Sequence, residues 1–189
     1  PDATAYRRLM TPVTKYWVCK IAPPLVYEAM ECLGGNAYVE EGGFPLLYRE
    51  VPVNAIWEGS GNVMCLDVLR AVERSPETLE RVLAGIEAAS GGEQRLKSAV
   101  DGVRILLGEA ARDQARARSV VELLALTAAG ALLQAHAPPA VSDAFLATRL
   151  YGAFRHTYGV GLGGADIHSI AARADAARTL GSATGRLPR

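Results

Sequence analysis

A carboxylate followed by a glycine-rich turn is the feature of this sequence best suited to chemistry. Glu58 stands directly before Gly59-Ser60-Gly61-Asn62, inside a stretch (48–63) that combines glycine, proline, tryptophan, charged and small polar residues. An apolar helical pattern begins after this turn, and the exposed backbone N–H groups of a helix start suit a phosphate or another anion. We therefore interpret residues 48–63 as the functional centre of the chain.

Two roles for Glu58 are open from the residues alone. Its carboxylate could bond the N–H groups of the turn or pair with Arg49, which would be a structural role. It could instead act as a general base, a role that usually requires partial burial among apolar side chains, and Ile56 and Trp57 are suitable neighbours.

Other candidate sites have simpler explanations. His136, His156 and His168 have no partners at metal-ligand spacing, so no metal site is predicted. The glycine-rich run 159–164 is not preceded by a strand pattern, so we interpret it as a connection and not as a dinucleotide-binding loop. Arginines that alternate with acidic residues after position 94 are typical of a solvated helix face.

Composition indicates one ordinary globular domain. The chain has 189 residues, half of them apolar, with 20 basic and 20 acidic residues, so its charge does not itself favour a nucleic-acid partner. Cys19, Cys32 and Cys65 lack paired spacing, which predicts reduced core thiols and a reducing, cytoplasmic location. No run approaches a membrane span, so no membrane partner is expected. The chain opens on Pro-Asp-Ala-Thr, and we expect it to be a fragment.

Helical periodicity and the absence of a strand pattern predict an all-α fold. We expect an antiparallel helical bundle with additional C-terminal helices, joined by short connections. The predicted helices cover residues 5–20, 25–33 after a break at Pro23-Pro24, 62–74, 76–89, 93–136 with a bend near Gly130, 141–158 and 165–173, and residues 37–54 are predicted to be loop.

Three segments together resemble the C-terminal helical region of the acyl-CoA dehydrogenases. They are residues 31–38 (ECLGGNAY), 48–50 (YRE) and 56–63 (IWEGSGNV). These enzymes are FAD-dependent flavoproteins, usually tetramers, that oxidise an acyl thioester to its enoyl form. The residue types at 8–12 (RLMTP), 15–17 (KYW), 57–62 (WEGSGN) and 65–70 (CLDVLR) are similar to those of the AidB branch, which is associated with the bacterial response to DNA alkylation. The close match runs from about residue 7 to residue 74.

The resemblance implies roles for particular residues. Glu58 matches the carboxylate that removes the α-proton of the substrate while a hydride passes to the flavin. Ser60 and Asn62 match positions that bind FAD, and Gly34 and Gly35 match a turn that approaches the adenine-dinucleotide end of FAD on a neighbouring subunit. Trp57, beside the base, would contact the substrate and narrow the acyl tunnel, which predicts weak or absent dehydrogenase activity.

Other features depart from the family pattern. Glu31 stands where many members have glutamine near the FAD, and Ala37 replaces the usual glycine. The family's N-terminal helical domain, its β-domain and the first helices of the bundle, which hold most of the flavin and acyl-CoA, are absent from this chain. We therefore expect the chain alone to be inactive, to retain no FAD and to act within a dimeric or tetrameric parent protein.

The resemblance divides the chain into three parts. Residues 1–75 would end the dehydrogenase-like bundle, residues 76–175 would be an AidB-like helical extension, and residues 176–189 would be a flexible tail. The alternative function is a flavin-containing protein that binds duplex DNA and protects it against alkylation. Its basic surface would comprise Arg70, Arg74, Arg95, Arg104, Arg112, Arg116 and Arg118. A third reading is an inert helical oligomerisation module.

Overall fold

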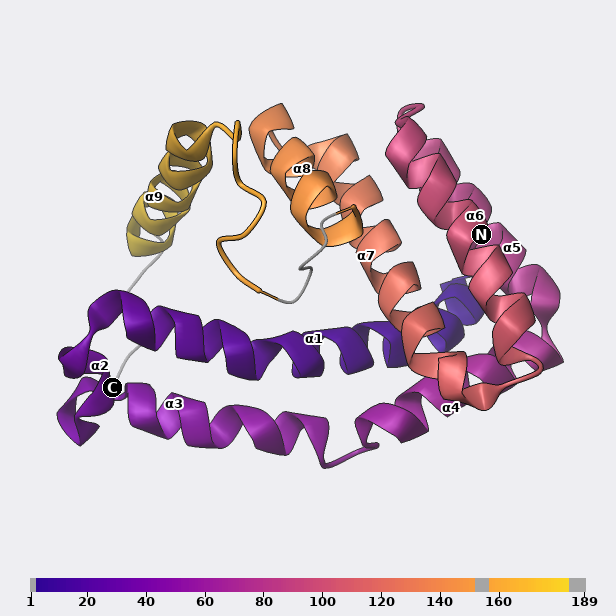
Figure 1. Cartoon of the computed structure of the whole chain (residues 1–189), viewed down its shortest axis with the longest axis horizontal. Coiled ribbons are helices and arrows are strands. Elements are labelled where there is room, and N and C mark those ends of the chain that lie inside the picture. Colours follow the sequence, from indigo (N-terminus) through magenta and orange to yellow (C-terminus); the bar gives the residue numbers. More distant parts are fainter. Residues whose placement is uncertain (1–2, 152–156, 184–189) are drawn as a thin grey trace.

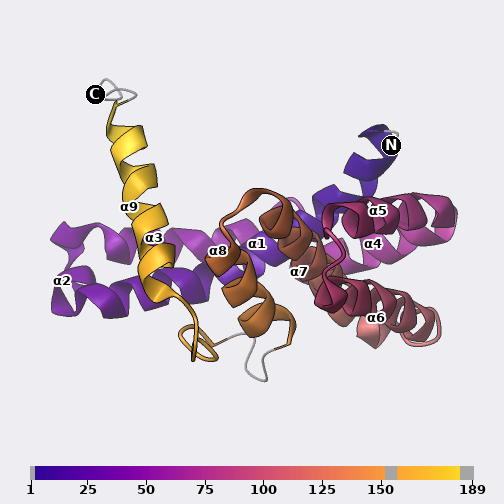
Figure 2. The same ribbon diagram turned by 90° about the horizontal axis from the view of Figure 1, so that it is seen from above.

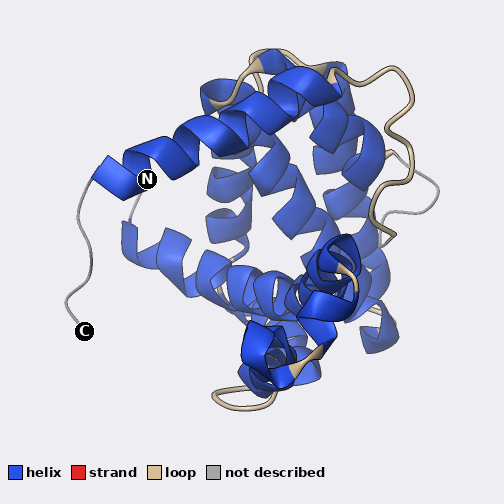
Figure 3. Cartoon of the chain, turned by 90° about the vertical axis from the view of Figure 1, so that its left-hand side faces the viewer, coloured by secondary structure: helices blue, strands red, loops and turns tan. Residues whose placement is uncertain are grey.

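Every regular element in the described part of the chain is a helix (Figure 3). The computed structural model describes residues 3–151 and 157–183. The predicted all-α class is therefore confirmed, and the arrangement of the helices decides which candidate residues meet.

Residues 3–74 form a long helical hairpin. Helix α1 (Ala3–Leu33) runs along the molecule, and the chain then turns through α2 (Gly35–Tyr38) and a short 3₁₀ turn, η1 (Glu40–Gly42). It returns beside α1 through α3 (Phe44–Glu50), the 3₁₀ turn η2 (Val51–Ala55) and α4 (Gly61–Arg74) (Figure 1). Residues 56–60, which connect η2 to α4 in this returning arm, are called the Glu58 loop below.

Two predictions for the hairpin are wrong. Pro23 and Pro24 do not end the first helix, since α1 continues through both of them to Leu33. Each internal proline removes one backbone hydrogen bond, but α1 packs against α2 and α3 as well, with the Tyr27 and Tyr48 rings 6.5 Å apart, and these contacts support the helix beyond the prolines. The predicted loop 37–54 is mostly helical, because Pro45 and Pro52 occupy first-turn positions in α3 and η2, where a missing N–H costs no bond.

A second group of helices crosses one end of the hairpin. It contains α5 (Pro76–Ala89), α6 (Gln94–Ala110), the 3₁₀ turn η3 (Gln114–Arg116), α7 (Ala117–His136) and α8 (Pro139–Phe145), which continues as one π-helical turn, Leu146–Leu150. Helix α9 (Ile167–Ala183) stands near the other end and contacts α8 (Figures 1 and 2). Short connections join α5 to α6 and α6 to α7, and these successive helices pack against one another.

The long helix predicted over residues 93–136 is two helices. The chain turns back at residues 111–113, where the Asp113 carboxylate accepts a hydrogen bond from the backbone N–H of Ala115 at 3.0 Å, so that α6 and α7 pack side by side. Gly130 does not mark a break, since it lies inside α7. A Cβ added there would lie 2.9 Å from a Leu146 methyl carbon and 3.0 Å from one of Leu96, so the glycine permits close packing.

The structure describes part of the region for which two C-terminal helices and a tail were predicted. The helix expected over 141–158 is present as α8 and its π turn up to Leu150, and residues 152–156 lie outside the described residues. Helix α9 is longer than the predicted 165–173, because it extends to Ala183. The flexible tail was predicted over residues 176–189, but residues 176–183 belong to α9, and the flexibility of residues 184–189, which are not described, stays a prediction.

Helix α7 lies at the centre of the core. Its Leu124 and Leu126 are fully buried, together with Val13 of α1, Leu83 of α5 and Val100 of α6. By length and composition alone the described stretch Gln114–His136 could cross a membrane, which corrects the expectation that no run approaches a span; half of it is buried in the fold. A central core helix has the same composition, and α7 packs against α1, α4, α5 and α6.

The prediction that all three cysteines are core thiols is correct for one of them. All three are unpaired in the structure, but only Cys65 is buried, whereas Cys19 is half-buried and Cys32 is exposed.

Gly130 provides a test of the packing between α7 and its neighbours. The change Gly130→Val should lower the free energy of unfolding by about 1–3 kcal/mol, because the added methyl groups meet Leu96 and Leu146 in a closed space. Urea denaturation would measure it. The matched control is Gly108→Val in α6, where an added Cβ meets nothing within 4 Å. Equal midpoints for the two variants would contradict the packing argument.

Candidate functional site

The Glu58 loop is fixed in place by a lysine from α1. The Lys15 ammonium group donates hydrogen bonds to the carbonyl oxygens of Asn54 at 2.9 Å and Trp57 at 2.8 Å. These two bonds connect the end of η2 to the long helix. Lys15 had no predicted site role and entered only as part of the family resemblance, because the two carbonyls become its partners only when the hairpin closes.

Glu58 itself has a left-handed backbone conformation. Its φ is +52°, the one positive value among the described residues other than glycine, and Gly59 follows with φ +106°. Left-handed backbone is unfavourable for residues with a Cβ and is found mainly where surrounding structure enforces it. The carboxylate is therefore placed by a constrained turn, which is compatible with a shaped site.

Neighbouring ion pairs define the surroundings of Glu58. It lines a surface pocket of about 640 Å³ together with Arg8, Lys15 and Asp67. Arg8 pairs with Asp67 through two hydrogen bonds of 2.6 and 2.8 Å, and this guanidinium holds the pKa of the Asp67 carboxyl below its usual range. Arg49, the predicted alternative partner of Glu58, instead pairs with Glu40 at 2.9 Å.

The apolar neighbours of Glu58 do not enclose it within this chain. The exposed fraction is 58% for Trp57 and 68% for Ile56, and Glu58 is also exposed. The partial burial expected for a general base is therefore not provided by the described residues. A further protein surface would have to cover this side of the hairpin for Glu58 to act as a base.

Ser60 and Asn62 lie at the start of α4, as predicted. Ser60 is the N-cap residue, and its side chain makes no capping hydrogen bond. The Asn62 side-chain oxygen accepts a hydrogen bond of 2.7 Å from Nε of Arg118, at the start of α7. Backbone N–H groups and nearby cations at this helix start fit an anionic group such as the phosphates of FAD. The predicted DNA-binding residue Arg118 is thus a neighbour of the predicted FAD site.

Gly34 and Gly35 are not brought together with Glu58. They lie at the α2 end of the hairpin, away from the loop between η2 and α4 (Figure 1). A Cβ added to either would meet nothing within 4 Å; Gly34 has φ +60°, which favours glycine, whereas packing among the described residues does not explain Gly35. Their exposed backbone is available to an external group, and the predicted contact with FAD of a neighbouring subunit stays a prediction.

Several of the seven predicted DNA-binding arginines are engaged by carboxylates. Arg95 pairs with Glu93 and Asp143, and Arg104 bonds Glu80, Glu87 and Asp101, while Arg116 lies 3.8 Å from Glu109. The pairs of Arg95 and Arg104 connect helices α5, α6 and α8, so these two arginines have structural partners. Arg70, Arg74 and Arg112 are exposed, and the first two lie near Asp67 and help to lower its pKa. The seven arginines do not form one unpaired basic surface.

Two other candidate sites from the sequence can be compared with the structure. The described residues contain no group of three or more potential metal ligands. The glycine-rich run 159–164 is a turn region, and the sequence analysis interpreted it as a connection.

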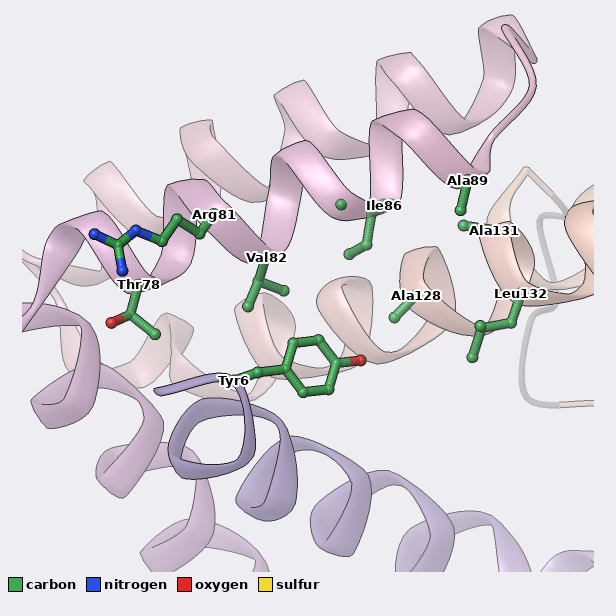
Figure 4. A pocket seen from close by; sticks show the side chains of 10 residues that line it. Tyr6, Thr78, Arg81, Val82, Ile86, Ala89, Ala128, Ala131 and Leu132 are labelled. Carbon is green, nitrogen blue, oxygen red and sulfur yellow. The ribbon is translucent and has the colours of Figure 1, made fainter. Parts of the chain in front are cut away.

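A small pocket of about 180 Å³ lies between the start of α1, α5 and α7, where Tyr6 faces Val82, Ala128 and Leu132 (Figure 4). Its lining is mainly apolar and contains no predicted site residue.

Comparison with known proteins shows the family to which the first part of the chain is similar. The family "Acyl-CoA dehydrogenase, C-terminal domain" matches residues 1–73, which end inside α4 just past the Glu58 loop. The chain is 39% identical over 140 residues to the putative acyl-CoA dehydrogenase AidB of Escherichia coli K12, covering 74% of this chain and 26% of that protein. It is 36% identical over 149 residues to acyl-CoA dehydrogenase family member 11 of Caenorhabditis elegans, covering 69% and 24%.

A solved structure extends the similarity to the crossing helices. The C. elegans protein ACDH-11, crystallised with C11-CoA, superposes with a TM-score of 0.63 at 29% identity. The superposition covers 92% of this chain and 33% of that chain, so it includes the helices after residue 73. The chain thus spans about a quarter to a third of the length of the relatives that it matches.

The conformation of Glu58 can be tested through stability. The change Glu58→Gly should raise the free energy of unfolding by up to about 1 kcal/mol, because glycine adopts a positive φ without a Cβ penalty, partly offset by a more flexible unfolded chain. Glu58→Gln keeps the Cβ and should leave the stability unchanged. Urea denaturation would measure both. Equal stability of the glycine and glutamine variants would show that the left-handed turn stores no strain.

The hydrogen bonds between Arg95 and Glu93 can be tested through the pH dependence of the free energy of unfolding. Hydrogen bonds from the side chain and backbone N–H of Arg95 lower the pKa of Glu93 from 4.5 to about 2. A lowered carboxyl pKa contributes stability that is present above pH 4.5 and is lost as the pH falls toward 2. Glu93→Gln should therefore cost about 1–2 kcal/mol at pH 7 and progressively less below pH 4.5. Exposed Glu41→Gln is the control, and a pH-independent difference for Glu93→Gln would contradict the assignment.

Proposed function

Because the chain belongs to the acyl-CoA dehydrogenase family, we propose that it is the C-terminal part of an FAD-dependent, acyl-CoA dehydrogenase-like protein whose catalytic base is Glu58. The observation that carries this proposal is the position of Glu58. Lys15 fastens its loop to α1, and its backbone is held at φ +52° directly before α4. A carboxylate held at one place on a rigid scaffold is what proton abstraction requires.

The proposed reaction uses Glu58 for one proton. Its carboxylate removes the proton from the α-carbon of an acyl thioester, while the β-carbon loses a hydride, so that a C=C bond forms. FAD, when bound, supplies the hydride acceptor. Glu58 is exposed in this chain, so the base also needs cover from the parts of the relatives that this chain does not contain. The activity is therefore proposed for the whole protein and not for the 189 residues alone.

The cofactor contacts are assigned to the start of α4. Ser60 has a side chain that caps no backbone group, and Asn62 is held by Arg118 at 2.7 Å, so both present polar groups beside backbone N–H donors. This donor set suits FAD phosphates or hydroxyls. Gly34 and Gly35 would approach the adenine end of FAD in a neighbouring subunit of a homo-oligomer.

An acyl-CoA substrate has support from a relative. ACDH-11 was crystallised with C11-CoA, an acyl thioester. Trp57, with 58% of its surface exposed beside Glu58, is in a position to contact an acyl chain and to limit its size. We propose an acyl-CoA of this general class as the substrate.

The alternative function, protection of DNA against alkylation, has weaker support. Arg95 and Arg104 are each paired with at least two carboxylates, which reduces the positive charge available to a phosphate backbone. No described contact favours duplex DNA over other anions, so DNA binding is not part of the proposed function.

The role of Glu58 is tested by flavin bleaching in the full-length parent protein. Addition of an acyl-CoA under anaerobic conditions should bleach the flavin of the wild type, and Glu58→Gln should slow this reaction by about a hundredfold or more, because general-base catalysis typically contributes that much. Absorbance near the flavin maximum would be followed.

Two controls accompany this measurement. Glu50→Gln removes the same charge from an exposed position at the end of α3 and should bleach at the wild-type rate. The 189-residue chain mixed with FAD should not bleach, since most of the cofactor pocket is outside it. Equal bleaching by wild type and Glu58→Gln would reject the assignment.

A further inference from the structure

The side-chain amide of Asn62 can meet a ligand in two opposite ways. It has one acceptor, the oxygen, and two N–H donors on the nitrogen. A rotation of about 180° around the last side-chain bond exchanges the two ends. The phosphate oxygens of FAD accept hydrogen bonds, so they would be bound by the nitrogen end of the amide and not by the oxygen end.

Arg118 of α7 fixes the orientation of this amide. Its Nε donates a hydrogen bond of 2.7 Å to the Asn62 side-chain oxygen. A guanidinium group has N–H donors and no acceptor, so the amide nitrogen cannot take the place of the oxygen in this bond. The nitrogen of Asn62 is therefore the end left for a ligand, and no described residue accepts a hydrogen bond from it.

The backbone that carries Arg118 is anchored in the core. Arg118 is the second residue of α7, and its neighbours Ala117, Val120 and Val121 are buried. Helix α7 also packs against α1 and α4. The guanidinium group itself is exposed, but the burial of the residues around it sets its distance from the start of α4.

The backbone that carries Asn62 is placed by contacts with α1. A Cβ added at Gly61 would lie 3.4 Å from the Tyr16 ring and 3.5 Å from a side-chain carbon of Lys20, so the start of α4 lies directly against α1. With both backbones placed, the bond to Arg118 decides which end of the amide is available. A donor that is oriented before the ligand arrives binds more tightly than one that must be ordered on binding.

We propose that Arg118 is a positioning residue of the cofactor site, which holds the Asn62 amide as a hydrogen-bond donor for an acceptor group of FAD. This role rests on the proposed function, in which Asn62 contacts FAD. Arg118 lies outside residues 1–73, which match the dehydrogenase C-terminal domain. A helix beyond the matched domain therefore sets the affinity of the cofactor site through one side chain.

The affinity of the full-length parent protein for FAD tests this role. After removal of any bound flavin, isothermal titration would measure the dissociation constant of FAD. Asn62→Ala and Arg118→Met should each raise it by about tenfold, since each loses the oriented donor to a charged group. The double variant should also lose about tenfold, because Arg118 acts only through Asn62. Arg118→Lys keeps a charged donor and should bind FAD more tightly than Arg118→Met.

Asn62→Asp separates the orientation of the amide from its contact with Arg118. The aspartate keeps an oxygen for Arg118 but has no N–H donor, so it should weaken FAD binding at least as much as Asn62→Ala. The matched control, Arg112→Met, replaces an exposed arginine in the turn between α6 and η3 and should bind FAD like the wild type. Circular dichroism would establish that each variant is folded.

The outcomes distinguish this role from the proposed function. A wild-type protein that does not bind FAD would reject the cofactor assignment and the role of Arg118 with it. If the wild type binds FAD, unchanged affinity in Arg118→Met or in Asn62→Asp would overturn the positioning role alone. An additive loss of about a hundredfold in the double variant would also overturn it, because Arg118 would then bind FAD directly. Glu58→Gln should bind FAD like the wild type, which keeps this result independent of flavin bleaching.

Discussion

The two hydrogen bonds from Lys15 to the carbonyl oxygens of Asn54 and Trp57 are the constraint on which the candidate site depends. They join the middle of α1 to the returning arm of the hairpin just before Glu58. Without them the exposed segment between η2 and α4 would have little to hold it, because Ile56 and Trp57 are not buried. The ammonium group satisfies the carbonyl oxygens of Asn54 and Trp57, and Glu58, with its positive φ, follows Trp57 directly.

Helix α1 separates two chemically different sides of the molecule. One side carries the Glu58 loop with the Arg8–Asp67 pair, and the other faces α7 and the π turn across a cleft of about 590 Å³. The start of α4 lies between them, since Asn62 bonds Arg118, and a Cβ at Gly61 would touch the Tyr16 ring at 3.4 Å and Lys20 at 3.5 Å. The helices after residue 73 therefore contribute directly to the surroundings of the dehydrogenase-like region.

The fold class and the Glu58 turn were predictable because both depend on local sequence. Helical periodicity extends over many residues, and a carboxylate before Gly-Ser-Gly-Asn is visible without any tertiary contact. The errors occurred where packing outweighs local preference. Pro23 and Pro24 remain inside α1 because the hairpin packs on both sides of them, and the apolar pattern of residues 93–136 gave no sign of the turn at 111–113.

By itself the sequence determined that the chain is helical, that Glu58, Ser60 and Asn62 cluster at a helix start, and that residues 31–63 resemble acyl-CoA dehydrogenases. These features are local, so neighbouring residues specify them. Only the tertiary structure decided the partners of the charged groups. Arg49 pairs with Glu40 and not with Glu58, Arg95 joins Asp143 of a distant helix, and Arg118 reaches Asn62 across 56 positions of sequence. Ion pairs and hydrogen bonds between side chains depend on distance in space, and helix packing sets that distance.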